Sequence, residues 1–291
     1  MKKALVVGGV GFVGTNLIKR LLKDKWKVYC IDNYSTGKKS NEQDGCTYIL
    51  DDICNYQEHG SRPVYWEQVV KDVDVIFHLA ALARIQPSLK RPSDTISTNV
   101  MGTVAILDIA WEFNKPVVYA GSSSFHHGLY GSAYAWSKRT GETLCELYSK
   151  VYDLNTSIFR FYNVYGEHQL EEGEYATVLG IFERQLRNKE PLTITGDGEQ
   201  RRDFTHVDDI VDGLVKAVGK EFRADIFELG SGKNYSINEV ANLFEHERTY
   251  IPARKGEYPF TLCDYSKAEK ELGWKPKGNL ETYIKGVIKW K

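Results

Sequence analysis

The chain has 291 residues, of which 42% are hydrophobic and 26% are charged, and its formal net charge is −1. This is the composition of an ordinary globular protein, long enough for one large domain or for a domain with a smaller lobe. Because the charge is close to zero, no overall field would attract nucleic acid or an anionic membrane surface, and we expect neither as a partner.

The five cysteines are scattered along the chain, and none of them forms a Cys-x-x-Cys pair. This pattern favours reduced thiols and argues against a disulfide framework or a thiolate metal site, so no metal is expected. No apolar run reaches the roughly 18 residues that span a bilayer. The apolar segment near Met1 is glycine-rich and lacks a convincing cleavage site, which favours a strand over a signal peptide. We therefore expect a cytoplasmic protein.

The N-terminal segment has the order of elements that is typical of a dinucleotide site. Residues 4–7 predict a short buried strand, the run Gly8-Gly-Val-Gly11-Phe-Val-Gly14 follows, and residues 16–25 predict a helix. Glycines let the backbone approach a pyrophosphate, and the N-terminus of the helix supplies free N–H groups. A glycine motif alone is weak evidence, but its place after the first strand favours a nucleotide site.

An acidic residue ends the second predicted strand. Residues 27–31 are apolar and rich in strand formers, and Asp32 follows them. A carboxylate at this point suits the hydroxyls of the adenosine ribose and would repel a 2′-phosphate. A turn-capping role is the alternative for Asp32. The position favours NAD over NADP.

Strands and helices continue to alternate through the first 162 residues. Further strands are predicted over residues 47–50, 73–81, 116–120 and 156–161, and a helix over 99–114. Asp52 and Ile53 follow the third strand and are expected beside the adenine, while the small Ala80 and Ala81 suit close packing against a cofactor. His78 is expected to be a hydrogen-bonded core residue. The alternation predicts an α/β fold with a doubly wound parallel sheet.

The composition changes after Tyr162. Residues 163–291 contain polar and acidic turns, between which shorter strand-like and helical pieces alternate. We interpret residues 1–162 as a dinucleotide-binding domain and residues 163–291 as a smaller lobe, interleaved with the last strands of the sheet.

A tyrosine and a lysine stand where acid–base chemistry could occur. The strand over 116–120 is followed by glycine and three serines, and a helix is predicted over 133–152. Tyr134 and Lys138 lie four residues apart in that helix, so their side chains share one face. A lysine ammonium lowers the pKa of a nearby phenol, and a serine at the strand end could bond to the same substrate hydroxyl. Such pairs also arise by chance, so the weight of this one comes from its surroundings.

Together these stretches resemble the extended short-chain dehydrogenase/reductase superfamily, and within it the NAD-dependent nucleotide-sugar epimerase/dehydratase branch. The resemblance runs nearly end to end and is carried by Gly8-x-x-Gly11-x-x-Gly14, Asp32 to Gly37, His78-Leu-Ala-Ala81, Asn99-Val-Met-Gly-Thr103, Ser122-Ser-Ser124, Tyr134-x-x-x-Lys138, Arg160 to Gly166, Gly196 to Asp208, Arg254-x-Gly-Glu257 and Leu272-Gly-Trp274. It implies a Rossmann-type sheet that binds NAD and a smaller C-terminal α/β lobe that binds a nucleotide sugar.

The resemblance also implies roles for individual residues. Tyr134 would exchange a proton with the sugar hydroxyl, Lys138 would hold the nicotinamide ribose and lower the pKa of the tyrosine, and Ser123 would orient the reacting oxygen. The cofactor is expected at Gly8, Gly11, Phe12, Val13, Asp32, Asn33, Ser35, Thr36, Gly37, Asp52, Ile53, Leu79, Ala80, Ala81, Asn99, Tyr134 and Lys138. The substrate is expected at Ser88, Ser123, Ser124, Phe125, Asn163, Val178, Thr193, Arg202, Arg254, Glu257 and Thr261.

The residues after the first serine indicate the reaction. Dehydratases of the family carry Thr-Asp-Glu, whose carboxyl pair eliminates water, whereas this chain has Ser123-Ser124-Phe125. An epimerase needs no such pair, so the resemblance implies epimerisation of a UDP-sugar at C4 through a transient 4-keto sugar. Thr261 matches a bulky tyrosine that excludes N-acetyl groups in hexose 4-epimerases, so UDP-glucose, UDP-galactose and their N-acetylated forms could fit. The run Phe125-His126-His127 departs from the family pattern and leaves the precise sugar open.

Two alternatives stay open. The chain could be another redox enzyme of nucleotide sugars, either a reductase or an epimerase at a different carbon, and net consumption of NADH would identify a reductase. It could also be a non-catalytic NAD-binding protein, although the Ser123, Tyr134 and Lys138 set argues against this. In the family, the helices that match 99–114 and 134–152 usually form a dimer interface. A homodimer is therefore expected, with an apolar face supplied by Trp111, Leu144, Leu147 and Tyr148.

Overall fold

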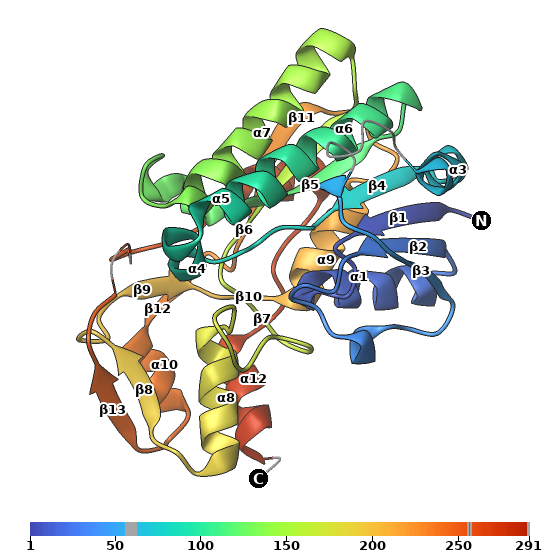
Figure 1. Ribbon diagram of the computed structural model, residues 1–291. Helices are drawn as coiled ribbons and strands as arrows, with labels where there is room; N and C mark the ends of the chain where they lie inside the picture. Colours follow the sequence, from blue (N-terminus) through green and yellow to red (C-terminus); the bar gives the residue numbers. More distant parts are fainter. Residues whose placement is uncertain (56–62, 255, 257, 290–291) are drawn as a thin grey trace.

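The computed structural model describes residues 1–55, 63–254, 256 and 258–289. At its centre lies a seven-stranded sheet in the order β11-β6-β5-β4-β1-β2-β3, with every neighbouring pair parallel (Figure 1). Its strands are β1 (Lys3–Val7), β2 (Lys27–Asp32), β3 (Cys46–Leu50), β4 (Val75–His78), β5 (Val117–Ser122), β6 (Thr156–Phe161) and β11 (Arg223–Leu229). The central strands are continuous apolar runs because both of their faces are covered. The predicted α/β fold with a doubly wound parallel sheet is confirmed.

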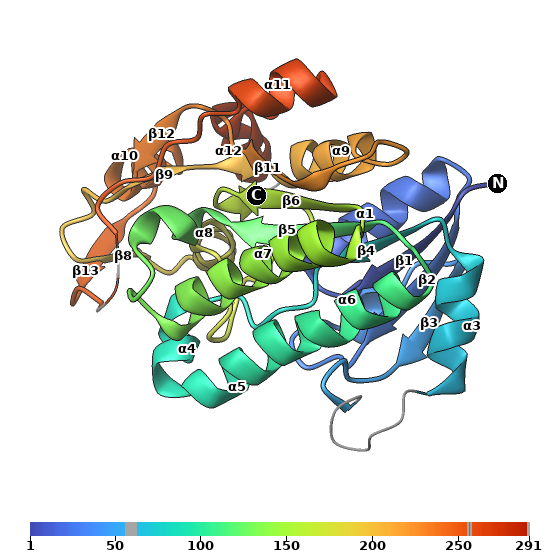
Figure 2. The same ribbon diagram turned by 90° about the horizontal axis from the view of Figure 1, so that it is seen from above.

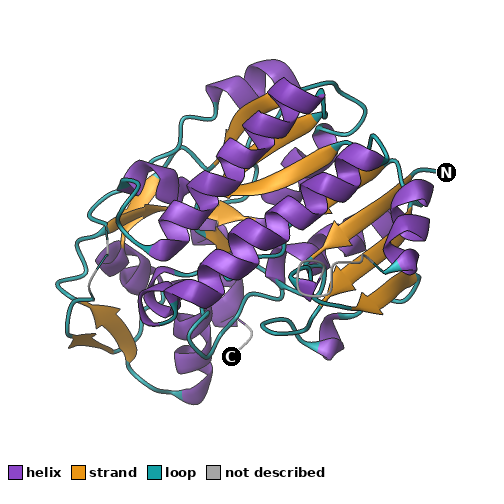
Figure 3. Cartoon of the chain, turned by 45° about the horizontal axis from the view of Figure 1, so that its top comes forward, coloured by secondary structure: helices purple, strands orange, loops and turns teal. Residues whose placement is uncertain are grey.

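A layer of helices covers each face of the sheet (Figures 2 and 3). One layer contains α1 (Phe12–Lys23), α9 (Val207–Lys216) and α11 (Ser266–Leu272), and the other contains α3 (Val64–Asp72), α6 (Gly102–Glu112) and α7 (Ala133–Tyr152). Shorter pieces are η1 (Lys39–Asn41), α4 (Ile85–Lys90), α5 (Pro92–Ile96), η2 (Ser97–Met101) and η3 (Ser123–His127). None of the helices in the described part of the chain has the length and apolarity that crossing a membrane requires.

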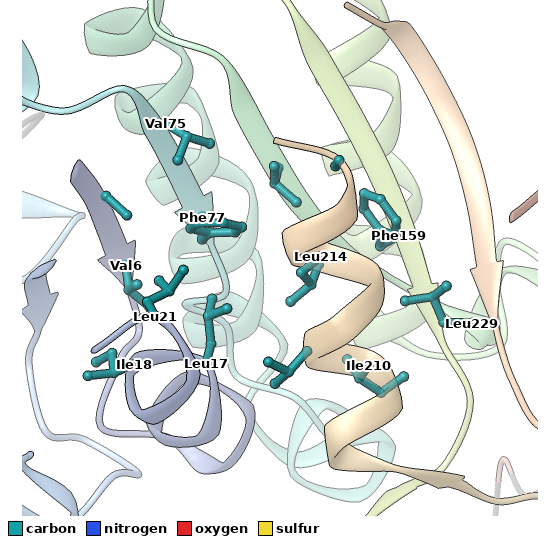
Figure 4. Packing of buried hydrophobic residues seen from close by; sticks show 14 of the residues in the cluster. Val6, Leu17, Ile18, Leu21, Val75, Phe77, Phe159, Ile210, Leu214 and Leu229 are labelled. Atoms are coloured by element: carbon teal, nitrogen blue, oxygen red, sulfur yellow. The ribbon is translucent and has the colours of Figure 1, made fainter. Parts of the chain in front are cut away.

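The sheet and its helices share two apolar cores. On one face, Leu17 of α1 and Leu214 of α9 pack towards Val6, Phe77 and Phe159 of the sheet, and all five side chains are fully buried (Figure 4). Each side chain of this kind stabilises the fold by about 1.5–3 kcal/mol through its removal from water. The strands are thus held in place on both sides, and this fixes the loops at their carboxyl ends.

The lobe is built from α8 (Val178–Asn188), α10 (Ile237–Leu243), α12 (Leu280–Lys289) and pairs of short strands. The pairs in the described residues are β7 (Val164–Tyr165) with β10 (Thr205–His206), β9 (Arg201–Asp203) with β12 (Asn234–Ser236), and β8 (Leu192–Thr195) with β13 (Arg248–Ile251). These elements enclose a third apolar core around Phe182 and Phe244. Helix α9 and strand β11 lie between lobe segments in the chain but belong to the sheet, so the two parts alternate after residue 162 (Figure 1).

One predicted helix differs from the structure. The sequence predicts a single helix over 99–114, but a π-helical turn at Ser97–Met101 precedes α6. Asn99 lies in this turn with its side chain buried. Its Oδ1 accepts a hydrogen bond of 2.8 Å from the Leu82 backbone N–H, and its Nδ2 donates one of 2.9 Å to Ser137 Oγ. The irregular turn therefore ties the segment after β4 to α7.

Candidate active site

A cavity of about 530 Å³ lies where the strands end, and residues of both the sheet domain and the lobe line it. The carboxyl ends of β1, β2, β4 and β5 face it, which is the usual ligand position in an open α/β sheet. It is lined by the glycine loop, the residues after β2 and β4, the serines after β5, the first turns of α7 and part of the lobe.

The glycine loop packs closely against the segment after β4. Gly8 has a φ of +84°, and a Cβ at this position would lie 2.6 Å from the backbone nitrogen of Ala80. Helix α1 begins after Gly11 with no side-chain cap and with no acidic residue in its first turn. Its first N–H groups therefore remain available to an anionic ligand.

Asp32 lines the cavity and also holds the glycine loop. Its Oδ2 accepts a hydrogen bond of 3.0 Å from the Val10 backbone N–H, and its Oδ1 accepts one of 2.8 Å from the Tyr34 backbone N–H. Burial raises the pKa of Asp32, and the two backbone hydrogen bonds oppose this shift. A glycine-rich loop, an uncapped helix N-terminus and a carboxylate at the end of β2 together fit NAD.

The structure brings most of the predicted cofactor residues together. The cavity is lined by Gly8, Gly11, Phe12, Val13, Asp32, Asn33, Ser35, Thr36, Asp52, Ile53, Leu79, Ala80, Ala81, Tyr134 and Lys138. Gly37 and Asn99 are placed differently from the prediction. A Cβ on Gly37 would lie 2.6 Å from the Val10 carbonyl oxygen, so this glycine packs behind the loop. Asn99 does not line the cavity either, and its side chain is hydrogen-bonded to Leu82 and Ser137.

Ser122 holds the hydroxyl of Tyr134. Ser132 caps α7 by accepting a hydrogen bond of 3.0 Å from the Ala135 backbone N–H, which places Tyr134 in the first turn of that helix. The Tyr134 hydroxyl donates a hydrogen bond of 3.2 Å to Ser122 Oγ. Ser122 could not be identified from the sequence as the hydrogen-bond partner of Tyr134, because no pattern distinguishes the three adjacent serines.

The other two serines line the same cavity. Ser123 and Ser124 both lie in the turn η3, whose N-cap is Ser122. The hydroxyl of Ser124 is buried and has no hydrogen-bond partner in the described part of the chain. An unpaired buried hydroxyl is costly, so a ligand in the cavity would gain by bonding to it.

Lys138 lies behind Tyr134 in a buried setting. Its Nζ donates a hydrogen bond of 2.6 Å to the Ala120 carbonyl oxygen and lies 4.8 Å from the centroid of the Tyr119 ring. Burial lowers the pKa of Lys138 to about 8, and the nearby Glu142 carboxylate opposes this. The ammonium is thus poorly solvated and open to a further acceptor, as a ribose hydroxyl would provide.

The charge that acts on Tyr134 comes from an unexpected residue. Burial raises the pKa of Tyr134, while the Ser122 hydrogen bond and the guanidinium of Arg84 lower it. From the sequence, Lys138 was expected to lower this pKa, and no role was predicted for Arg84. Arg84 lines the cavity directly before α4, and α4 packs against α7. No local pattern marks Arg84, because its position depends on contacts that are distant in sequence.

The predicted substrate residues divide into two groups. Ser123, Ser124, Asn163, Val178, Thr193, Arg202 and Arg254 line the cavity. Ser88, Phe125 and Thr261 do not line it, and Glu257 lies outside the described residues.

The three residues outside the lining each have another role. Ser88 Oγ donates a hydrogen bond of 2.7 Å to the Ile85 carbonyl oxygen within α4. Thr261 Oγ1 accepts a hydrogen bond of 3.1 Å from the Asp203 backbone N–H, so it lies behind the wall, while Tyr258 of the same segment reaches the cavity. A small residue at 261 therefore does not by itself enlarge the cavity. The third residue, Phe125, lies on a charged cluster at the edge of the site.

The unusual Phe125 and His126 meet a buried arginine. The Arg160 guanidinium lies 3.5 Å from the centroid of the Phe125 ring. Arg160 Nη2 bonds to Glu142 Oε2 at 2.7 Å, and its Nη1 lies 3.3 Å from Glu228 Oε1. His126 Nε2 lies 2.7 Å from the same Glu228 oxygen. This cluster anchors the turn η3 to α7, β6 and β11.

The fold and this cavity define a class of enzyme that acts on nucleotide sugars with NAD. The chain matches the NAD dependent epimerase/dehydratase family over residues 4–230, and it belongs to that family. It is accordingly an NAD-dependent enzyme.

Individual relatives cover nearly the whole chain. It is 31% identical to a putative UDP-glucose 4-epimerase of Methanocaldococcus jannaschii, over 98% of this chain and 97% of the relative. The structure of UDP-glucose 4-epimerase from Thermotoga maritima, with UDP-glucose, is similar with a TM-score of 0.89 and 27% identity, over 99% and 98% of the two chains. That of UDP-glucuronic acid 4-epimerase from Bacillus cereus, with UDP-glucuronic acid and NAD, has a TM-score of 0.87 and 26% identity, over 99% and 98%. These relatives act on different sugars.

Proposed function

We propose that the protein catalyses the NAD-dependent epimerisation of a UDP-sugar at C4 through a transient 4-keto sugar. The observation that carries this proposal is the Tyr134 hydroxyl, bonded to Ser122 Oγ at 3.2 Å and facing the cavity that the glycine loop enters. A phenol held in this way can take a proton from a sugar hydroxyl and return it. The relatives named above support the same chemistry.

The residues divide the reaction between them. Oxidation of C4 removes a hydride from carbon and a proton from the C4 hydroxyl, and Tyr134 takes the proton. NAD, when bound, would supply the reversible hydride acceptor. Lys138 would hold the nicotinamide ribose, and Ser123 would orient the oxygen on C4. When the keto sugar has presented its other face, hydride and proton return, and C4 is inverted without net redox change.

The lobe would hold the nucleotide. Arg202 and Arg254 line the cavity, and arginine forks bind phosphate oxygens in pairs. Asn163 also lines it and donates a hydrogen bond of 2.8 Å to the Asp203 carbonyl oxygen, so its place in the wall is fixed. These residues would place the diphosphate away from Tyr134 and leave the sugar ring beside it.

The turn after β5 argues against the elimination of water. Positions 123–125 carry two hydroxyls and a phenyl ring, whereas elimination needs a proton donor and an acceptor on the sugar. The alternatives of a reductase or of epimerisation at another carbon are tested by product analysis. The alternative of a non-catalytic NAD-binding protein is excluded if any of these sugars is turned over.

The proposal is tested by proton NMR of the protein with NAD and UDP-glucose, UDP-N-acetylglucosamine or UDP-glucuronate. We expect the C4-epimer of at least one sugar to grow to equilibrium with no net NADH. The matched variant Tyr134→Phe should bind NAD and lose turnover by about 100-fold or more. Net NADH consumption, inversion at another carbon or full activity of Tyr134→Phe would each overturn the proposal.

We further propose that the protein forms a homodimer through α6 and α7, which lie side by side on one face of the sheet (Figure 2). Trp111 and Leu147 are about half exposed there, and the rings of Trp111 and Tyr152 lie 5.0 Å apart. Leu144 and Tyr148, by contrast, pack into the core. Sedimentation of Leu147→Glu against the unaltered chain tests this, since a charge at that face should favour the monomer.

The expected cytoplasmic location stays a prediction.

A further inference from the structure

Arg84 places a positive charge at the catalytic end of the cavity. It directly precedes α4, which packs against α7, and its charge acts on the Tyr134 phenol in the first turn of α7. The residue is partly buried and lines the cavity. A cation here faces the part of the ligand that reacts.

The described residues offer this guanidinium no carboxylate partner. Arg84 Nε donates a hydrogen bond of 3.0 Å to the Tyr175 carbonyl oxygen, which fixes the direction of the fork. The neighbouring Glu174 is already paired with Lys90 at 3.0 Å and with Arg91 at 2.8 Å. Among the described residues, no carboxylate is paired with Arg84. A partly buried cation in this state is relieved by a ligand anion.

A second donor lines the same cavity. The Ser124 hydroxyl is buried and has no hydrogen-bond partner among the residues that the structure describes, and it lies two residues after the serine that holds Tyr134. A guanidinium and a hydroxyl are a donor set suited to a carboxylate, which accepts several hydrogen bonds at once.

The chemistry of the sugar decides which anion this is. The diphosphate is attached at C1, across the ring from C4, and Arg202 and Arg254, which line the cavity, would bind it. Tyr134 acts on the oxygen of C4, and C5 is the next ring carbon. C3, the other neighbour of C4, carries a neutral hydroxyl in these sugars, so of the two neighbouring carbons only C5 can present an anion to a cation beside Tyr134.

We propose that the preferred substrate is a UDP-uronate, whose C5 substituent is a carboxylate, and that Arg84 and Ser124 bind this carboxylate. Arg84 is then the specificity-determining residue of the site. This inference rests on the proposed function, because that function places C4 at Tyr134.

The test compares kcat/KM for UDP-glucuronate and UDP-glucose, with NAD present and the C4-epimers measured by NMR. We expect the unaltered protein to prefer UDP-glucuronate by about tenfold or more. Arg84→Gln should lower that preference by about 10- to 100-fold, because one charge-assisted contact is lost. Ser124→Ala should lower it by a smaller factor, and Arg84→Lys should keep part of it.

The matched control is Arg91→Gln, which removes a neighbouring arginine that does not line the cavity. It should leave the preference unchanged, and NAD binding should show that each variant is folded. A preference for UDP-glucose, or a preference that Arg84→Gln and Ser124→Ala leave unchanged, would overturn the inference while 4-epimerisation stands. Conversion of UDP-glucuronate to a UDP-pentose would support carboxylate binding and overturn 4-epimerisation. Turnover of neither sugar would overturn the inference, and 4-epimerisation would then fall only if UDP-N-acetylglucosamine is not turned over either.

Discussion

The Tyr134 hydroxyl bonds to Ser122 Oγ at 3.2 Å, across the gap between the end of β5 and the first turn of α7. Ser122 is thereby committed to the tyrosine and to the turn η3, because its Oγ also accepts from the Ser124 backbone N–H at 3.1 Å. Ser123 is left facing the cavity. The two serines therefore have separable roles, one towards the tyrosine and one towards the substrate.

Ser122→Ala should shift the dependence of kcat/KM on pH. The Ser122 hydrogen bond lowers the pKa of Tyr134, so its loss raises that pKa and moves the rising limb of the profile to higher pH. Activity at neutral pH should fall by about tenfold or more. Ser123→Ala should lower kcat/KM without shifting the pH at which the profile rises. An unshifted profile in Ser122→Ala would contradict the assigned role.

Asp32→Asn should weaken NAD binding. The substitution keeps the size of the side chain but removes its charge. It also replaces one of the two carboxylate oxygens that accept backbone hydrogen bonds with an NH₂ group, which cannot accept one. Loss of a charged hydrogen-bond acceptor costs about 1.5–3 kcal/mol, so Kd should rise by about 10- to 100-fold. Titration calorimetry measures this directly. Asp24→Asn, on the surface after α1, serves as the control and should bind NAD normally.

Arg160→Leu should destabilise the fold. Arg160 and Glu142 are almost fully buried, and removal of the arginine leaves Glu142 with the more distant Arg139 alone, at 3.3 Å, and takes the guanidinium away from Glu228. Breaking a buried pair in this way costs about 3–5 kcal/mol. Urea unfolding should show that loss. Arg223→Leu removes an exposed arginine paired with Asp153, and it should change the free energy of unfolding by less than about 1 kcal/mol. Equal effects of the two variants would contradict this account of the cluster.

Glu183 should make the lobe less stable as pH rises. Burial raises the pKa of its carboxyl from 4.5 to about 7, although Gln169 donates a hydrogen bond of 2.8 Å to it. The folded protein therefore holds a proton that the unfolded chain has already lost, and stability falls between about pH 4.5 and pH 7. Glu183→Gln removes the charge and should raise Tm at pH 8 more than at pH 5. The exposed Glu190→Gln should not, and an equal gain at both pH values in Glu183→Gln would argue against the shift.

The sheet and the cofactor loop could be predicted from the sequence because their signals are local. A strand, a glycine run and a helix in succession predict the turn around Gly8, and Asp32 follows from the end of the next strand. Tyr134 and Lys138 follow from helical spacing. Each of these patterns lies within a short segment of chain.

The remaining site residues depend on contacts that no local pattern carries. Arg84 is held by Tyr175, 91 positions further along the chain, and His126 meets Glu228 over a separation of 102. The choice between Ser122 and Ser123 depends on the register of one short turn. Thr261 lies behind the residues that line the cavity, where its hydroxyl accepts a hydrogen bond from the Asp203 backbone N–H. This contact joins residues that are distant in sequence.

The most direct test of 4-epimerisation uses a UDP-sugar that carries deuterium on C4, with product analysed by NMR and NADH followed by absorbance. UDP-glucuronate, UDP-glucose and UDP-N-acetylglucosamine are all used, so the result does not depend on which of these sugars is preferred. If the same hydride leaves C4 and returns, the epimer keeps its deuterium at C4 and no NADH accumulates. Replacement of the deuterium by solvent hydrogen, or stoichiometric NADH, would contradict inversion through a transient 4-keto sugar.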